Sequence, residues 1–303
     1  MSKTKKAKAK NTKTKTLKTK SAQVESFKQQ DNEWFSTEVF TKLALIFLFV
    51  QALGLFVAKQ LLFQGMQQAP FGESIDDLSN SFYLFGVIIA MTVFLLILMR
   101  LRKTRKILFF IEAMAIFSTS LIVFSSLLPT NDLAAFGLTA LVLLWRYTHI
   151  KDIIFRDFTS LICIAGAGAF IGISLGLFPI LAFIIILAIY DIIAVFYTKH
   201  MVEIGKTAVG NNFAFTVAIP TKKHVFELGN GDLVIPLMVA SSIMVNGPFT
   251  QNWLVSGLCL GASFIGLMTS IYTVSTKRIP LPALPPQTLY MVLVIIVALL
   301  MGF

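Results

Sequence analysis

Long apolar runs separated by short polar stretches make up the chain from about residue 40 to its end. Nine such runs are each bounded by charge, by proline, or by asparagine and glycine, and most approach the about 20 residues that a helix needs to cross a bilayer. They occupy residues 40–63, 82–101, 107–128, 133–147, 158–178, 179–198, 230–248, 254–274 and 285–302. The pattern predicts an all-α membrane protein with nine transmembrane helices.

Two places in this pattern are irregular. The runs 158–178 and 179–198 meet at Pro179 with almost no loop, which favours a proline in the first turn of the second helix. The run 133–147 is short for a span, but Asp132 and Arg146 at its flanks favour a membrane hairpin over a surface helix.

Composition supports the membrane assignment and excludes a soluble globular enzyme. Of the 303 residues, 56% are hydrophobic and 14% are charged, whereas soluble domains carry about 25% charge. The net charge is +11, and ten lysines and one glutamate in residues 1–30 contribute +9 of it. We expect residues 1–32 to be a disordered, lysine-rich cytoplasmic tail on anionic lipid, and residues 33–303 to be the helical domain. Nucleic-acid binding is not expected, because the rest of the chain carries only +2.

The loop charges orient the nine predicted spans. Of the 26 lysines and arginines, 25 fall on the side of the N-terminus, and only Lys59 falls on the other side. The positive-inside rule therefore places the N-terminus in the cytoplasm and the C-terminus outside.

Several side chains are expected to be structural. Cys163 and Cys259 lie inside apolar runs, and the three histidines have no metal-ligand spacing, so neither a metal nor another cofactor is expected. Glu112 lies near the cytoplasmic end of its run, where Lys106 is a nearby candidate partner. The small residues Gly168, Gly172, Gly176, Gly257 and Gly261 have the spacing of closely packed membrane helices.

Two aspartates in neighbouring runs need a different explanation, because a carboxylate in a bilayer is costly. Asp191 has no basic residue within a turn or two and lies about 10 Å below the cytoplasmic end of its run. Asp232 enters the next run from the same side, about 9 Å after Phe226. Two close carboxyls do not both ionise, so one can activate water while the other protonates an amide carbonyl.

Glycines lie directly before the second aspartate, and a proline-rich segment precedes the last run. Gly229 and Gly231 flank Asn230 directly before Asp232, and glycine allows another chain to approach closely. Four prolines in residues 278–287 predict extended backbone with unpaired carbonyls at the cytoplasmic entrance to the last run. Such backbone is tolerated in a membrane only where protein buries it or a wet cavity adjoins it.

Taken together, Tyr190-Asp191, Gly229-Asn230-Gly231-Asp232 and Pro282-Ala283-Leu284 resemble the presenilin and signal peptide peptidase family of intramembrane aspartyl proteases, of the Gly-x-Gly-Asp type. The resemblance implies that Asp191 and Asp232 are the catalytic pair and that transmembrane segments are the substrates. It also implies that the remaining residues of these motifs shape the active site or bind substrate; they are Tyr190, Gly229, Gly231, Pro282, Ala283 and Leu284.

Further features refine this resemblance. The chain lacks a long acidic loop and is similar to compact microbial, archaeal-type members, which implies a prokaryotic plasma membrane. Residues 232–236 look closer to the signal peptide peptidase branch, whereas the charge-derived orientation matches presenilin, so substrate orientation stays open. Residues 199–228 read as a cytoplasmic loop containing the β-prone run FAFTVAIP. The resemblance implies that this segment orders against an extended substrate.

Two other functions compete with this hypothesis. A prepilin peptidase also uses a Gly-x-Gly-Asp aspartate, but that family does not call for Tyr190-Asp191 or Pro282-Ala283-Leu284. A proton- or cation-coupled transporter also uses paired intramembrane carboxylates. It predicts an inverted repeat, which is not visible in the sequence. The sequence leaves the physiological substrate and the oligomeric state open.

Overall fold

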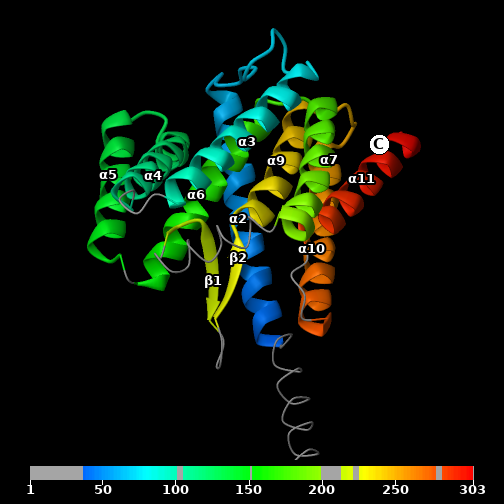
Figure 1. Ribbon diagram of the computed structural model, residues 1–303. Helices are drawn as coiled ribbons and strands as arrows, with labels where there is room; N and C mark the ends of the chain where they lie inside the picture. Colours follow the sequence, from blue (N-terminus) through cyan, green and yellow to red (C-terminus); the bar gives the residue numbers. More distant parts are fainter. Residues whose placement is uncertain are drawn as a thin grey trace, which may run out of the picture.

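The structure, a computed structural model, describes residues 37–100, 105–150, 152–198, 213–220, 225–277 and 282–302. The tail predicted for residues 1–32 lies outside the described residues, as do residues 199–212 of the predicted loop. Within the described ranges there are nine α-helices, one π-helical turn and one two-stranded sheet (Figure 1).

Each α-helix overlaps one of the predicted apolar runs. The helices are α2 (Thr37–Phe63), α3 (Ser79–Arg100), α4 (Arg105–Leu127), α5 (Asp132–Thr148), α6 (Ile153–Ile173), α7 (Leu177–Ile193), α9 (Gly231–Asn246), α10 (Asn252–Lys277) and α11 (Leu284–Met301). Seven segments are long and apolar enough to cross a bilayer, one of them being α7 together with its π-helical continuation, Leu177–Tyr197. The helices α5, with 17 residues, and α9, with 16, are not among these seven. The helical architecture is confirmed, and the count of nine crossings stays a prediction.

The junction between α6 and α7 follows the prediction in part. Pro179 is the third residue of α7, so it lies in the first turn, where its missing N–H costs no helical hydrogen bond. However, α6 begins at Ile153 and not at residue 158, and it buries Arg156. The helix α7 is continued by the π-helical turn Ala194–Thr198.

A β-hairpin corrects the all-α prediction. The strand β1 (Thr216–Pro220) pairs antiparallel with β2 (Val225–Gly229), with Thr216 opposite Gly229. The sequence analysis placed residues 199–228 in a loop whose β-prone run FAFTVAIP contains β1. It took the apolar character from Phe226 as leading into the next helical run, because a short apolar run fits a strand and a helix equally well. Asp232 is therefore in the first turn of α9 and not 9 Å inside a helix.

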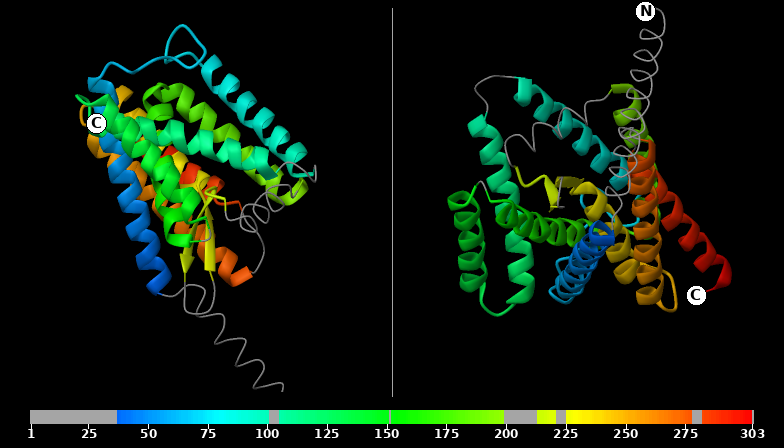
Figure 2. Two further views of the ribbon diagram at one scale, coloured as in Figure 1. Left: turned by 90° about the vertical axis from the view of Figure 1, so that its left-hand side faces the viewer. Right: turned by 90° about the horizontal axis from the view of Figure 1, so that it is seen from below.

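The hairpin lies at the end of the bundle where α2 begins and α10 ends (Figure 1). Seen along the bundle in Figure 2, it is central, with α4 and α5 on one side and α10 and α11 on the other. Val217 and Leu228 are buried in one apolar cluster with Leu43 of α2 and Leu267 of α10. The hairpin is thus part of the packed interior.

Close approaches of helices pack α9 against α2 and α6. A Cβ atom on Gly168 would lie 2.7 Å from the Leu237 side chain, and one on Gly172 would lie 2.6 Å from the Met238 carbonyl oxygen. The packing roles predicted for these two glycines are confirmed. No atom of the described residues lies within 4 Å of a Cβ built on Gly257 or Gly261, so no described helix packs closely on this pair.

Candidate active site

Asp232 is the second residue of α9 and follows directly on the turn that ends β2. The backbone N–H of Gly229 donates a hydrogen bond to its carboxyl group. A Cβ on Gly229 would lie 3.5 Å from Asp232 Oδ2, and a Cβ on Gly231 would meet no described atom within 4 Å. The backbone is therefore open at Gly231, whereas a side chain at Gly229 would be in ordinary contact with the carboxylate; the substrate-binding role of both glycines stays a prediction.

Asp191 lies in the last turn of α7 and is 9% exposed. Its Oδ2 accepts a hydrogen bond of 3.3 Å from the backbone N–H of Leu284, the last residue of the Pro-Ala-Leu motif. This bond is long for an N–H···O contact. It nevertheless joins two of the three predicted motifs directly.

The third motif, which ends at Asp232, lies beside Asp191. Asp191 and Asp232 lie close enough for their carboxylates to interact electrostatically. Among the described residues, neither carboxylate takes part in an ion pair. The arrangement supplies one acid group from each of two neighbouring helices, which is what water-activated amide hydrolysis requires. No three His, Cys, Asp or Glu side chains in the described ranges gather as a metal site.

Tyr190 connects α7 with α3. Its hydroxyl group hydrogen-bonds with Thr92, and its ring packs edge-on against Phe85 at a centroid distance of 5.8 Å. These contacts brace the helix that carries Asp191. A contact of Tyr190 with substrate stays a prediction.

The Pro-Ala-Leu motif leads directly into α11. Pro282 is buried, Ala283 packs against the cluster shared by α2 and α10, and Leu284 packs against the cluster shared by α7 and α9. The helix begins at Leu284 and accommodates Pro285 and Pro286 in its first turn. The extended backbone predicted through residue 287 is therefore wrong for residues 284–287, because proline fits a first helical turn.

Two residues that the sequence analysis did not single out hold the start of α11 in place. A Cβ on Gly266 of α10 would lie 2.7 Å from both the backbone N and the Cα of Gln287. Ser263 Oγ donates a 2.9 Å hydrogen bond to Gln287 Oε1, and Gln287 is fully buried. In the sequence, these contacts are indicated only by a polar residue, Gln287, next to an apolar run, and this pattern is too common to interpret alone.

A polar network supports the turn before Asp232. Asn230 Nδ2 donates to the Ala214 carbonyl at 2.8 Å, and the Ala214 N–H donates to Glu112 Oε1 at 2.9 Å. Arg146 Nη2 also donates to Glu112 Oε1 at 2.9 Å, and both charged side chains are buried. The structural role expected for Glu112 holds, but its partner is Arg146 and not Lys106.

A second charged group fixes the hairpin to α6. Arg156 is 2% exposed and donates to both carboxylate oxygens of Glu227 in β2 at 3.1 Å. The Ala218 N–H of β1 donates to Asp157 Oδ1 at 3.0 Å. The sequence analysis missed this anchor, because it assigned Arg156 to a loop on the basis of its charge.

Comparison with known proteins identifies the family of the chain. The profile described as signal-peptide peptidase, presenilin aspartyl protease matches residues 44–300. The chain belongs to this family. Two solved structures of a presenilin family intramembrane aspartate protease, in space groups C222 and P2, resemble the chain. The first is 25% identical with a TM-score of 0.65, covering 85% of this chain and 97% of that one. The second is 26% identical with a TM-score of 0.58, covering 85% and 96%.

These findings settle the class of function. The chain is a multi-pass membrane protein of the presenilin and signal peptide peptidase family, with the function of an intramembrane aspartyl protease. They do not support the transporter alternative. No curated protein matches the sequence at a significant level.

Proposed function

We propose that Asp191 and Asp232 are the catalytic pair of this protease and that it is of the Gly-x-Gly-Asp type. The observation that carries the proposal is the meeting of three separate motifs, in which Leu284 N–H binds Asp191 and Asp191 interacts electrostatically with Asp232. Prepilin peptidases do not call for the Pro-Ala-Leu motif, so this meeting also favours the presenilin-type site.

The chemistry follows from two carboxyl groups that share one proton. The ionised carboxylate takes a proton from water, and the water oxygen attacks the carbonyl carbon of the substrate amide. The protonated carboxyl donates its proton to the carbonyl oxygen. The carboxyl that took the water proton then gives it to the amide nitrogen, and the other carboxylate takes a hydroxyl proton from the tetrahedral intermediate, so that the carbonyl re-forms and the C–N bond breaks.

The hairpin offers a way to hold the substrate in extended form. A transmembrane helix has no accessible amide until it unwinds, and a strand added to a sheet edge is held by main-chain hydrogen bonds. Each strand of a two-stranded sheet has one edge outside the sheet. Because β2 ends at Gly229, three residues before Asp232, a substrate strand on its edge leads directly to the carboxylate.

The membrane placement completes the proposal. All nine helices of residues 33–303 cross the bilayer, with the N-terminus in the cytoplasm and the C-terminus outside. The lysine-rich residues 1–32 lie on anionic lipid, and the membrane is a prokaryotic plasma membrane. The charge asymmetry of the sequence supports this orientation.

Cleavage of a labelled single-span peptide in liposomes tests the catalytic assignment. We expect Asp191→Asn and Asp232→Asn each to lower the rate by at least about 10²–10⁴-fold, because each removes an acid or base while keeping the shape. Asp132→Asn, an exposed aspartate at the start of α5, is the matched control and should cut normally. A folded Asp191 or Asp232 variant that still cuts at the normal rate overturns the assignment. The cut position reports the orientation of the substrate.

A further inference from the structure

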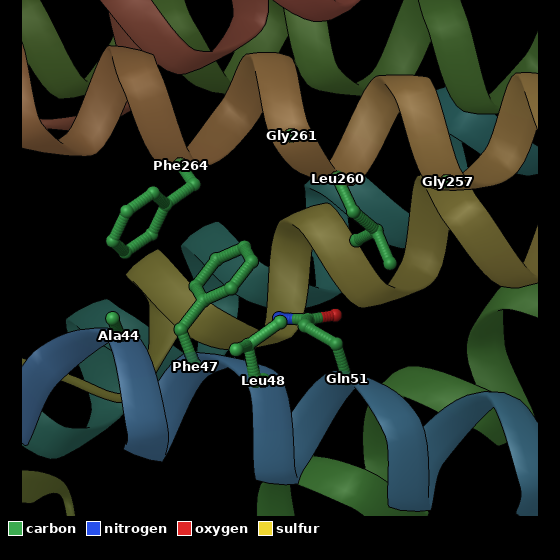
Figure 3. Close-up of a pocket in the computed structure, with 8 residues that line it drawn as sticks. All are labelled: Ala44, Phe47, Leu48, Gln51, Gly257, Leu260, Gly261 and Phe264. Carbon is green, nitrogen blue, oxygen red and sulfur yellow. The ribbon is translucent and has the colours of Figure 1, made fainter.

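A groove runs between α2 and α10 on the outside of the bundle (Figure 3). Neither of the two aspartates lines it. Four residues of each helix line it, and its volume is about 360 Å³. Phe264 of α10 closes one end by packing on Phe47 of α2, with ring centroids 5.1 Å apart. The helix α9, which carries Asp232, lies behind the groove.

The α10 wall of the groove exposes backbone at two glycines. Gly257 and Gly261 lie four residues apart on this wall, both are exposed, and neither has a described atom within 4 Å of a built Cβ. In membranes, glycines at this spacing let a second helix approach the backbone closely. Within the described chain, no helix uses this pair.

A polar group at the floor of the groove has an unused acceptor. Gln51 is 2% exposed, and its Nε2 donates to the Leu233 carbonyl at 3.0 Å. That bond fixes the amide orientation, so Oε1 is the free end. Among the described residues Oε1 has no hydrogen-bond partner, and Figure 3 shows it turned toward the end where Gly257 lies.

The chemistry of this acceptor limits what can fill the groove. Gln51 is the fifteenth of 27 residues in α2, so it lies near the middle of the bilayer. A phospholipid acyl chain has no hydrogen-bond donor at that depth. A single water would find one polar side chain, whereas buried waters have two to four polar partners.

A symmetric dimer through the groove also fails to supply a donor. In a two-fold contact centred on the groove, the same concave surface faces itself, so neither copy fills the groove of the other. Gln51 is 2% exposed at the floor of the groove, so the second N–H of its amide does not reach Oε1 of the other copy across two opposed grooves.

We infer that the α2–α10 groove is a docking site for a transmembrane helix of another protein, which presents small side chains to Gly257 and Gly261 and one serine, threonine or asparagine donor to Gln51. Small residues together with one interhelical hydrogen bond are the usual means of helix association in bilayers. The inference goes beyond the protease function and does not depend on it. Because Leu233 follows Asp232 directly, the Gln51 amide connects the docked helix to the first turn of α9.

Binding of two designed probe helices tests this site. Both are 23-residue, leucine- and alanine-rich helices with terminal lysines, and they differ only in a central serine or alanine. Their affinity for the full chain is measured by energy transfer in phosphatidylcholine–phosphatidylglycerol vesicles, with Asp232→Asn in the background so that no probe is cut. We expect the serine probe to bind about three- to tenfold more tightly than the alanine probe.

Variants of the protein locate the binding. Gln51→Leu should remove the preference for serine, and Gly261→Leu should abolish binding of both probes by filling the groove. Gly137→Leu is the matched control, since Gly137 of α5 is also exposed and also has no described atom within 4 Å of its Cβ. It should bind both probes as the parent does.

Three outcomes overturn the inference. Equal affinity for both probes means that Gln51 does not select a hydrogen-bond donor, and the groove is then a site for apolar chains such as lipid. A serine preference that survives Gly261→Leu places the contact elsewhere. Self-association of labelled copies that disappears in Gly261→Leu assigns the groove to a second copy. Cleavage assays on the parent chain are separate, so loss of the protease assignment leaves this test unaffected.

Discussion

The surroundings of Asp232 and those of Asp191 differ in the kind of contact that positions each carboxylate. The turn before Asp232 is held by hydrogen bonds that lead through Asn230 and Ala214 to the buried Glu112–Arg146 pair. Asp191 lies in an apolar helix and accepts one long bond from Leu284, whose own position depends on the packing of α11 against α10. One side of the site is thus fixed by charge and the other by shape, so different substitutions should damage each side.

The largest effect is expected from breaking the charged side. Arg146→Met leaves Glu112 buried without its cation, which we expect to cost about 3–5 kcal/mol of unfolding free energy. Titration with sodium dodecyl sulfate in mixed micelles measures this quantity. The double variant Glu112→Leu with Arg146→Met should recover much of the loss, because it removes both charges. No recovery in the double variant would contradict an electrostatic origin.

The shape-dependent side is broken by adding a single methyl group. Gly266→Ala places a Cβ 2.7 Å from the Gln287 backbone, so α11 must shift and carry Leu284 away from Asp191. We expect a loss of about 1–3 kcal/mol in unfolding free energy and a slower cleavage rate. Gly257→Ala, on the same helix in open space, is the control and should stay within about 0.5 kcal/mol. Equal effects of both substitutions would show that helix propensity, and not the contact with α11, matters.

A smaller effect is expected at the turn itself. Asn230→Leu removes the donor to the Ala214 carbonyl and should cost about 0.5–1.5 kcal/mol, together with a lower cleavage rate. The cost is limited because Ser160 Oγ also donates to that carbonyl, at 3.1 Å. Combining Asn230→Leu with Ser160→Ala should therefore cost more than the sum of the single variants. Strict additivity of the two would argue against a shared acceptor.

The smallest effect should come from Tyr190→Phe. This change removes the hydroxyl contact with Thr92 and keeps the ring on Phe85, so we expect a loss of about 0.6 kcal/mol. Thr92→Val should have the same effect, and the double variant should add nothing. The cleavage rate should change by less than about threefold if the hydroxyl only braces α7. A much larger fall in rate for Tyr190→Phe alone would indicate direct contact with the substrate.

The helices were predictable from sequence because a bilayer demands long apolar runs, and each run marks its own ends. Of the hairpin, the β-prone run FAFTVAIP contains β1, but β2 was not predictable, since residues 225–229 form a short apolar run next to a helix and have no periodicity of their own. The same ambiguity moved Asp232 from the interior of a helix to its first turn. Hydropathy therefore predicts where helices pass but not where a strand replaces the end of one.

The three motifs of the site were visible in the sequence, and the structure brings them together at Asp191 and Asp232. Their supports were not visible. Arg146 lies 34 residues from Glu112, and which face of α5 meets α4 is decided by packing across many residues. Arg156 was assigned to a loop because charge normally ends a membrane span, yet it is buried within α6 and binds Glu227. Pairings between distant elements leave no local signal in one sequence.

The two prolines in the first turn of α11 have a consequence for hydration. A helix normally begins with four backbone N–H groups that have no partner in the helix and attract solvent. At the start of α11, Pro285 and Pro286 have no N–H, and Leu284 gives its own to Asp191. This helix end therefore binds little water of its own. Under the proposed mechanism, a water beside Asp191 then has fewer backbone groups competing for it.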